Sequence, residues 1–318
     1  DYSYGMVCNQ PVTTEPAADF WPKSTGLFVD ESLKFIQEHK DGPFFLQLWL
    51  LLPHAPLNPT EEQLEPYKRF TPNEKSWAHT PYLSAESIYY AAVGDIDTQI
   101  GRFLDALDAM GIADNTIVLF SSDNGPEDIH IGGAGHSGVG SAGPFRGRKR
   151  SLYEGGIRLP FIVRWPGHVP AGRVDNTSVV AAVDFLPTLC KIAGAEIPAN
   201  HALDGEAMDD VWCGASRPRA TPLFWEWRFH IFGEVFHRSP MLAVREGDYK
   251  LLFNPSRDRV ELYDIPNDPS QLNNLAAAKP DLVEDLAAKA LAWQTTLPPG
   301  PCDKTAGKCD YNWPKGKE

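Results

Sequence analysis

The stretch "NTIVLFSSDNGPE", residues Asn115–Glu127, joins an apolar run to a short polar segment that Gly and Pro interrupt at once. The run Asn115–Phe120 predicts a buried strand, because its last four side chains are apolar and follow one another without a polar break. Asp123 and Asn124 then come at the strand end, where the sites of α/β folds usually form. Their carboxylate and amide oxygens suit Ca²⁺ or Mg²⁺, although Asp-Asn-Gly is also common turn chemistry. The stretch therefore predicts either a pair of divalent-cation ligands or a simple turn.

Helical and strand-like patterns alternate on both sides of this stretch. Amphipathic patterns predict helices over residues 25–42, 84–112 and 183–195, and apolar runs predict strands over residues 44–53 and 156–167. Such alternation is typical of a sheet that helices cover on both faces. We therefore expect an α/β core over residues 1–220, with a mixed, mostly parallel sheet sandwiched by helices.

The segment beyond residue 220 has a different pattern. Short apolar runs separated by turn residues predict antiparallel strands, and "PDLVEDLAAKALAWQTTL" at residues 280–297 predicts a helix. This pattern indicates a smaller C-terminal α+β subdomain over residues 221–318.

The composition excludes some classes of protein. The 318 residues carry a formal net charge of −13, which argues against a nucleic-acid partner, since such proteins usually present a basic face. We expect no membrane span, because no apolar run is long enough. The start at Asp1 lacks the basic and apolar parts of a signal peptide, which indicates a mature chain or part of a longer one. Cys302 and Cys309 lie in a loop-like tail, where they either close a small disulfide ring or stay free.

Two further segments carry side chains that suit an anionic substrate. "LPHAPLNP" at residues 52–59 holds His54 between two prolines, just after the predicted strand. His54 is a candidate general acid or a ligand for an anionic oxygen, and the alternative is a solvent-facing loop histidine. "RGRKRSLYEGGIRLP" at residues 146–160 places Lys149 just before a tight Glu-Gly-Gly turn. A lysine fixed there can hold the oxygens of a tetrahedral anion as a point charge.

Together these segments resemble a known family. From about Lys23 to about Ala278, the chain resembles the later two-thirds of a type I, formylglycine-dependent sulfatase of the alkaline-phosphatase-like superfamily. The resemblance rests on four phrases in the family's order: "FFLQLWLLLPHAP" (44–56), "GDIDTQIGRFLDALDAMGIADNTIVLFSSDNGPE" (94–127), "RKRSLYEGGIRLPFIVRWPGHVPAG" (148–172) and "AAVDFLPTLCKIAG" (181–194).

The resemblance implies a role for each matching residue. Asp123 and Asn124 match the family's second pair of metal ligands, normally for Ca²⁺, with Mg²⁺ as the other candidate. His54 matches the histidine that contacts the sulfate or the leaving oxygen, and Lys149 matches the lysine that binds the sulfate.

The same alignment gives weaker assignments to other residues. Arg148 becomes a cation at the rim of the substrate site, and His136, in "GAGHSGVG", a candidate for lining the leaving-group pocket. Asp95 and Asp97 fall on a predicted helix, where we expect a solvated face and a helix contact and not metal ligands.

The chain also departs from the family pattern. The nucleophile phrase Cys/Ser-x-Pro-x-Arg does not occur, because Cys8 lies in "VCNQPVT", which has no arginine. The family's early acidic pair, lysine and histidine are missing as well. Ca²⁺ takes about six to eight oxygen ligands, so Asp123 and Asn124 form an incomplete site by themselves. We therefore expect the formylglycine and the other metal ligands on an N-terminal segment or chain outside this one, and apolar sheet surface exposed where it would pack.

The predicted function is a calcium-assisted sulfatase that hydrolyses a sulfate ester, in a periplasmic, secreted or lysosomal protein. The aromatic segment Pro222–His237 can stack on sugar rings, which favours a sulfated carbohydrate, but it can also form a hydrophobic seam against the core. Two alternatives stay open: a catalytically inactive sulfatase-like binding chain or subunit, and a phosphodiesterase or phosphonate monoester hydrolase of the same superfamily.

Overall fold

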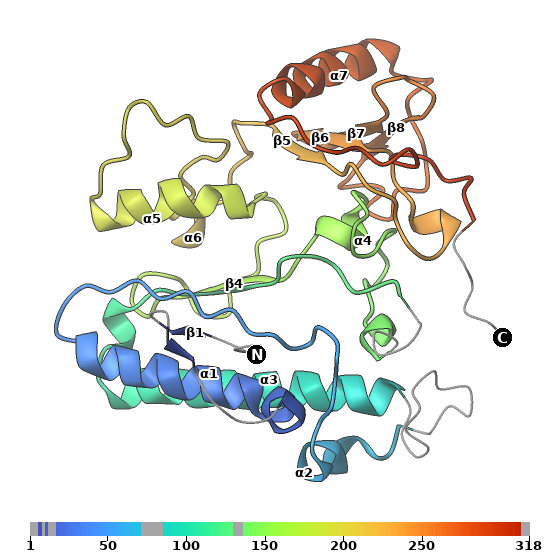
Figure 1. Ribbon diagram of the computed structural model, residues 1–318. Helices are drawn as coiled ribbons and strands as arrows, with labels where there is room; N and C mark the ends of the chain where they lie inside the picture. The colour runs from blue at the N-terminus through green and yellow to red at the C-terminus, as the bar shows by residue number, and fades with distance from the viewer. Residues whose placement is uncertain (1–5, 8–9, 12–16, 71–84, 130–135, 313–318) are drawn as a thin grey trace. The chain divides into compact units, whose positions relative to one another are not determined.

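The chain forms two compact units in the computed structural model, which describes residues 6–7, 10–11, 17–70, 85–129 and 136–312 (Figure 1). The first unit comprises Asp1–Thr116, Pro126–Ser141 and Gly316–Glu318, and the second comprises Ile117–Gly125 and Ala142–Lys315. The stretch that ends in Asp123 and Asn124 therefore belongs to the second unit. The predicted division at residue 220 falls inside that unit and stays a prediction.

Two long helices form the frame of the first unit. Helix α1 (Ala17–His39) packs along α3 (Ala85–Ala109), as Figure 1 shows. The Arg102 guanidinium on α3 lies 2.6 Å from the Asp30 carboxylate of α1 and donates to the Gly26 carbonyl oxygen at 3.1 Å. The helices predicted over residues 25–42 and 84–112 are thus confirmed, with α1 beginning earlier in the chain.

The remaining elements of the first unit are short. Helix α2 (Glu61–Leu64) begins with a capping box, in which Thr60 and Gln63 exchange side-chain-to-backbone hydrogen bonds. The buried side chain of Leu64 then packs against α3. The other short elements are β1 (Met6–Val7), β2 (Gln10–Pro11), η1 (Glu65–Tyr67), η2 (Ala113–Asn115) and η4 (Ser137–Val139), with β1 and β2 antiparallel.

The segment of residues 44–53 departs from the sequence-based expectation. The prediction of a core strand is wrong: the segment pairs with no strand among the described residues, and over residues 43–50 its side chains alternate between half-buried and exposed. Phe45 is 69% exposed and Trp49 78%. An apolar run shows a need for burial, but a strand also needs a neighbour to pair its backbone groups. The described part of the chain supplies no such neighbour.

A two-stranded antiparallel sheet carries the opening stretch in the second unit. Strand β3 (Val118–Ser121) pairs with β4 (Phe161–Arg164). Leu119, Phe161 and Val163 pack against the buried cluster around Trp212. The opposite face exposes the paired residues Phe120 and Ile162, of which Ile162 is 58% exposed. This exposed apolar pair matches the expectation of uncovered sheet surface.

A buried ion pair fixes the helices beside this sheet. Arg219 contacts both carboxylate oxygens of Asp184, at 2.5 and 2.7 Å, and the same carboxylate accepts hydrogen bonds from the backbone N–H groups of Ala181 and Glu206. Because every acceptor site is used, Asp184 has a structural role. The elements of this region are η5 (Ala182–Asp184), α5 (Phe185–Ala193) and α6 (Asp209–Trp212).

A four-stranded antiparallel sheet forms the C-terminal part, in the order β5-β6-β7-β8. Its strands are Leu223–Glu226, Leu242–Glu246, Tyr249–Phe253 and Val260–Asp264. Between β5 and β6 lies η6 (Val235–His237). Leu242, Val244, Leu251 and Phe253 face α7 (Pro280–Gln294), which covers one side of the sheet (Figure 1).

The alternate residues of the same strands face the other way, because side chains along a strand alternate between its two faces. Ala243, Leu252 and Tyr263 pack with Leu152 and Tyr153, the two residues before α4 (Glu154–Ile157). The C-terminal sheet is therefore enclosed between α7 and the α4 segment. This packing positions the chain around Lys149.

The antiparallel strands and the helix predicted beyond residue 220 are confirmed. So is the mixed α/β composition, but every strand pair among the described residues is antiparallel, so the parallel part of the expected sheet does not lie within these strands. None of the helices in the described ranges has the length and apolar character needed to cross a bilayer.

Candidate active site

Lys149 occupies the tip of a tight turn. The Arg148 carbonyl oxygen accepts a hydrogen bond from the Ser151 N–H at 2.9 Å, which makes Lys149 and Arg150 the two central residues. Arg150 has a φ of 76°, a conformation that side-chain-bearing residues seldom adopt. Strained backbone of this kind persists where the surrounding structure fixes it, and it is concentrated at functional sites.

Three glycines fix this turn against the end of β3. The Gly125 N–H donates to the Gly156 carbonyl oxygen at 2.9 Å, and the Gly155 N–H donates to the Arg146 carbonyl oxygen at 2.7 Å. A Cβ on Gly125 would lie 2.0 Å from the Gly155 carbonyl oxygen, and a Cβ on Gly156 would lie 2.6 Å from that of Arg148. Only glycine permits so close an approach of backbone to backbone. The Asp123–Asn124 pair and the Lys149 turn are therefore held to the same short helix, α4.

The ligand atoms of the pair are available. Asp123 is exposed, and its carboxylate makes no hydrogen bond or ion pair with any described residue. The Asn124 amide Nδ2 donates to the Gly125 carbonyl oxygen at 2.9 Å, which leaves its Oδ1 without a donor within the described ranges. The pair thus offers one negative charge and an amide oxygen, a hard donor set that fits Ca²⁺ or Mg²⁺.

The predicted metal site is incomplete within the described residues. Among the described residues, no three His, Cys, Asp or Glu side chains come together as a metal would require. Asp123 and Asn124 fit part of a calcium shell, which takes about six to eight oxygen ligands. Asp95 and Asp97 lie on helix α3, as predicted, and their place outside the metal site stays a prediction.

A buried ion pair anchors α4 to the C-terminal sheet. The Lys250 Nζ on β7 lies 2.7 Å from Glu154 Oε1, and the Arg158 Nε lies 2.9 Å from Glu154 Oε2. Both Lys250 and Glu154 are buried. Burial by itself raises the pKa of Glu154, but the adjacent Lys250 ammonium and Arg158 outweigh it and hold the pKa below its usual value. Glu154 is therefore a charged structural residue directly before the glycine pair.

Arg146 is structural as well. Its guanidinium donates to the Phe236 and Gln271 carbonyl oxygens and to the Tyr263 hydroxyl, and it lies 3.9 Å from the centre of the Tyr153 ring. These contacts use most of its donors in binding one part of the second unit to another. Arg146 thus serves the fold.

His54 and His136 belong to the first unit. The His54 Nδ1 lies 2.6 Å from the Ala55 carbonyl oxygen, which can only accept, so Nδ1 carries a proton and Nε2 is the free position. His54 is exposed. The residue before it, Pro53, accepts a hydrogen bond at its carbonyl oxygen from Ser137 Oγ at 3.1 Å. The segments that carry the two histidines are therefore joined.

The environment of His136 differs from that of His54. Burial lowers the pKa of His136, because the charged imidazolium is poorly solvated there. Its Nε2 is buried and has no hydrogen-bond partner within the part of the chain that the structure describes. A neutral ring with an unused nitrogen is compatible with the predicted place in a leaving-group pocket, which stays a prediction.

The structure thus divides the predicted site residues between the units. Asp123, Asn124, Arg148 and Lys149 lie in the second unit, and His54 and His136 in the first. The sequence analysis did not identify Lys250 as important. This lysine lies at a buried position of β7, where the strand pattern predicts an apolar side chain. A charged residue at an inward-facing strand position was the feature of the sequence that could have indicated a buried ion pair.

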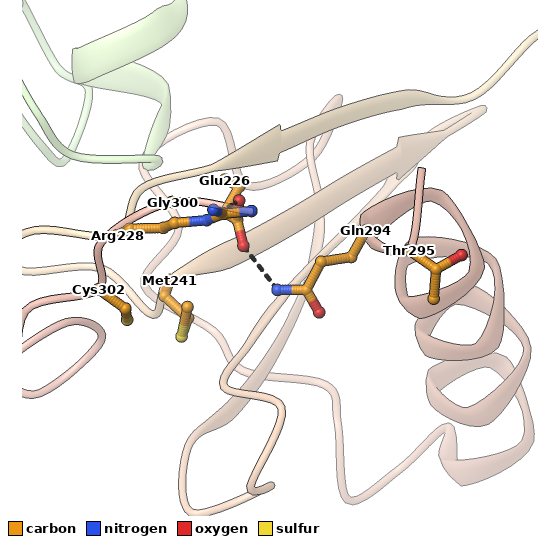
Figure 2. Close-up of a pocket in the computed structure, with 7 residues that line it drawn as sticks. All are labelled: Glu226, Arg228, Met241, Gln294, Thr295, Gly300 and Cys302. Carbon is orange, nitrogen blue, oxygen red and sulfur yellow. Dashed lines mark hydrogen bonds and ion pairs between the residues drawn. The ribbon is translucent and has the colours of Figure 1, made fainter. Parts of the chain in front are cut away.

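A cavity of about 330 Å³ lies elsewhere in the second unit, at the edge of the C-terminal sheet. Figure 2 shows its lining: Glu226, Arg228, Met241, Gln294, Thr295, Gly300 and Cys302. The Glu226 carboxylate is already used by the Arg228 Nε at 2.5 Å and the Gln294 amide at 2.6 Å. No predicted site residue lines this cavity, and its acid is engaged, so we assign it no chemistry.

The cysteines of the described chain are unpaired. Cys190, Cys213, Cys302 and Cys309 are free thiols in the structure, so the disulfide alternative for Cys302 and Cys309 is not formed. The tail is held instead by other contacts, including hydrogen bonds from Arg238 to the Cys309 and Tyr311 carbonyl oxygens.

Comparisons with known proteins identify the family. Residues 3–195 match the sulfatase family, and residues 143–293 match the C-terminal region of N-sulphoglucosamine sulphohydrolase. The chain therefore belongs to the sulfatase family, which confirms the resemblance drawn from its motifs.

Individual relatives agree with this assignment. A sulfatase of Formosa agariphila is 31% identical over 293 residues, which are 85% of this chain and 50% of that protein. Arylsulfatase D of Homo sapiens is 33% identical over 237 residues, 73% of this chain and 35% of that protein. The crystal structure of Ps i-CgsB in complex with k-i-k-neocarrahexaose is similar, with a TM-score of 0.69 at 26% identity, over 85% of this chain and 54% of that one.

These comparisons confirm the α/β, alkaline-phosphatase-like fold. They also show that this chain spans about half, or less, of the length of the relatives it matches.

Proposed function

We propose that this chain forms part of a sulfatase that hydrolyses the sulfate ester of a sulfated carbohydrate. The observation that carries the proposal is the backbone contact among Gly125, Gly155 and Gly156, which holds a pair of oxygen ligands and a lysine-tipped turn on one short helix. A divalent cation and a lysine together neutralise a tetrahedral oxyanion, which is what cleavage of a sulfate ester requires.

Lys149 has the role of a sulfate ligand in this proposal. Lys149 is one of the two central residues of a turn whose backbone is fixed by hydrogen bonds and whose other central residue, Arg150, has a positive φ. Its charge would stabilise the negative oxygens of the ester as they gain charge in the transition state. Arg148, in the same turn, would add positive charge at the rim of the site.

His54 has the role of a proton donor to the departing alcohol oxygen. Its Nδ1–H is directed to the Ala55 carbonyl oxygen, so Nε2 is the atom that can hold and give the proton. After the transfer, the neutral ring keeps its Nδ1–H and its hydrogen bond, so its orientation does not change. General acids of this kind typically contribute about 10²- to 10⁴-fold to the rate.

Asp123 and Asn124 would hold a Ca²⁺ or Mg²⁺ ion together with ligands from outside this chain. When bound, the ion supplies a fixed double positive charge beside the ester oxygens. The orientation of Asn124, whose Nδ2 is tied to its own backbone, leaves the amide oxygen as the ligand atom.

The nucleophile of the proposed reaction lies outside this chain. In the family it is a formylglycine, and no residue here has the surrounding phrase. The exposed apolar residues Phe45 and Trp49 in the first unit, and Phe120 and Ile162 in the second, support an additional segment or chain that would cover them. We therefore assign the complete activity to a longer protein or an assembly, in a periplasmic, secreted or lysosomal setting.

A sulfated carbohydrate is the proposed substrate class because the similar structure Ps i-CgsB was solved in complex with k-i-k-neocarrahexaose. Aromatic side chains of the segment Pro222–His237 add support. Trp225 and Trp227 pack in the core as the seam interpretation predicted, whereas Phe229 and Phe236 are exposed.

The test uses the complete protein that contains this chain. We expect Lys149→Ala and His54→Ala each to lower kcat by at least about a hundredfold without loss of folding, because both act on charge that develops in the reaction. Lys191→Ala is the matched control, since Lys191 is an exposed lysine whose ion partner is Asp209 on α6. Full activity in both active-site variants would overturn the assignment.

Two alternatives have their own outcomes. A catalytically inactive binding chain would bind a sulfated saccharide in calorimetry and release no sulfate from any ester. A phosphodiesterase or phosphonate monoester hydrolase would turn over phosphate or phosphonate esters faster than the matching sulfate ester.

A further inference from the structure

The loop of residues 229–237, between β5 and β6, exposes apolar side chains although its backbone is fixed. The buried Arg238 donates to the carbonyl oxygens of Gly233 at 2.8 Å and of Tyr311 at 2.6 Å, which holds the base of the loop. Phe236 is 50% exposed, Val235 55% and Phe229 44%. Several large apolar side chains on one short, anchored loop form a patch of the kind that marks a binding surface.

Three contacts join this loop to residues 146–150, the segment that leads into and includes the central residues of the Lys149 turn. The Arg146 Nε donates to the Phe236 carbonyl oxygen at 2.8 Å. The Arg150 guanidinium lies 4.5 Å from the centre of the Phe232 ring. The Gly147 N–H donates to the Nδ1 of His237 at 3.0 Å. The exposed aromatic side chain and the sulfate-binding lysine are therefore presented by one connected pair of loops.

The hydrogen bond to Gly147 fixes the chemical state of His237. A backbone N–H can only donate, so Nδ1 is the acceptor and the proton of the neutral ring lies on Nε2. Burial, together with Arg148 and Arg146, lowers the pKa of His237, whereas Glu234 acts in the opposite direction. His237 thus presents a neutral N–H donor, and Nε2 has no protein acceptor within the described ranges.

We propose that Phe236 and His237 recognise the sugar ring whose sulfate Lys149 binds, and so determine which esters the enzyme accepts. This inference rests on the proposed sulfatase function. The half-exposed Phe236 offers an apolar face for the C–H side of a pyranose ring, and the His237 Nε2–H donates to a sugar hydroxyl or ring oxygen.

The combination of groups favours a saccharide over other sulfate esters. A pyranose has one apolar face and hydroxyl groups around its rim, so it uses an aromatic surface and a neutral donor together. A flat aryl ester would use only the apolar surface. The flanking cations Arg148 and Lys149 complement a ring that also bears a sulfate.

The experiment compares two kinds of substrate in the complete enzyme. The probes are 4-nitrophenyl sulfate and a set of sulfated mono- and oligosaccharides of galactose, glucosamine and N-acetylgalactosamine, from which the best wild-type substrate is taken. We expect Phe236→Ala and His237→Gln to lower kcat/KM for the saccharide by about tenfold or more, which is about 1.4 kcal/mol of lost recognition. We expect a change of less than about threefold for 4-nitrophenyl sulfate.

Two control variants separate recognition from packing. Val174→Ala removes an apolar side chain that is 78% exposed and lies outside the loop of residues 229–237, and it should leave both substrates unchanged. Phe236→Leu keeps an apolar group against Arg146 but removes the ring, and should behave like Phe236→Ala on the saccharide.

The other outcomes are distinct. Equal losses on both substrates, or no loss on either, would overturn the role in sugar recognition and leave the sulfatase assignment in place. So would a wild-type enzyme that cleaves 4-nitrophenyl sulfate and none of the saccharides. A wild-type enzyme that releases sulfate from no ester would overturn the proposed function and this inference together.

Discussion

Replacing Lys250 by methionine should destabilise the second unit strongly, because it leaves a buried carboxylate without its nearest cation. Lys250 Nζ and Glu154 Oε1 are 2.7 Å apart, and their side chains are 0% and 4% exposed. Removing one member of such a pair typically costs about 3 to 5 kcal/mol of stability, since the remaining charge stays out of water. Arg158 still contacts Glu154 at 2.9 Å, but it is 37% exposed, so we expect the lower end, about 3 kcal/mol.

Urea unfolding followed by tryptophan fluorescence measures this change. The Trp225 ring lies 5.5 Å from Lys250 Nζ and reports on the sheet that carries the pair. The midpoint should fall while the denaturant slope stays constant, because the surface exposed on unfolding is nearly unchanged.

The double variant Glu154→Gln with Lys250→Met provides the control. It removes the buried carboxylate as well and leaves Arg158, which is 37% exposed, without its Glu154 partner, so it should be more stable than Lys250→Met alone by at least about 1 kcal/mol. A loss below about 1 kcal/mol in Lys250→Met, or no recovery in the double variant, would refute the view that the ion pair anchors α4.

The remaining predictions concern the Lys149 turn and the first unit. Gly155→Ala would place a Cβ 2.2 Å from the Gly147 carbonyl oxygen, so it should lower the stability measured by thermal unfolding by about 1 to 3 kcal/mol. Gly101→Ala on α3 is the control: nothing lies within 4 Å of its Cβ, so it should be neutral or stabilising. Equal effects of the two substitutions would contradict the packing argument. In the folded state the pKa of His136 lies below its usual 6.5, so as pH falls this ring takes up a proton in the unfolded chain before it does so in the folded one. The stability of the wild type should therefore decrease as pH drops below about 6.5. His136→Gln should lose less stability over that interval, and an identical pH dependence of urea unfolding in both proteins would show that burial of this ring does not matter.

Much of the candidate site could be predicted from local sequence. Asp123 and Asn124 are marked by a strand followed directly by Gly and Pro, and Lys149 by the Glu-Gly-Gly phrase after it. Such features depend on neighbouring residues, because turn chemistry and strand ends are local properties of the backbone. The helices α3, α5 and α7 were predicted for the same reason, since a repeat of 3.6 residues is visible in any amphipathic segment.

The sequence was misleading where a partner decides the structure. The apolar run at residues 44–53 predicts a strand, yet nothing in the described chain pairs with it. Periodicity reports which side chains favour burial, and it does not report whether a neighbouring strand is present.

The sequence by itself determined the family, the order of its motifs and the residues at the ends of its strands. Only the tertiary structure showed that Lys250 supports Glu154, 96 residues away, and that His237 accepts a hydrogen bond from Gly147, 90 residues away. The physical reason is the range of the interactions: caps, turns and amphipathic patterns are decided within a few residues, whereas a buried charge or a fixed tautomer depends on groups that only the folded chain brings into contact.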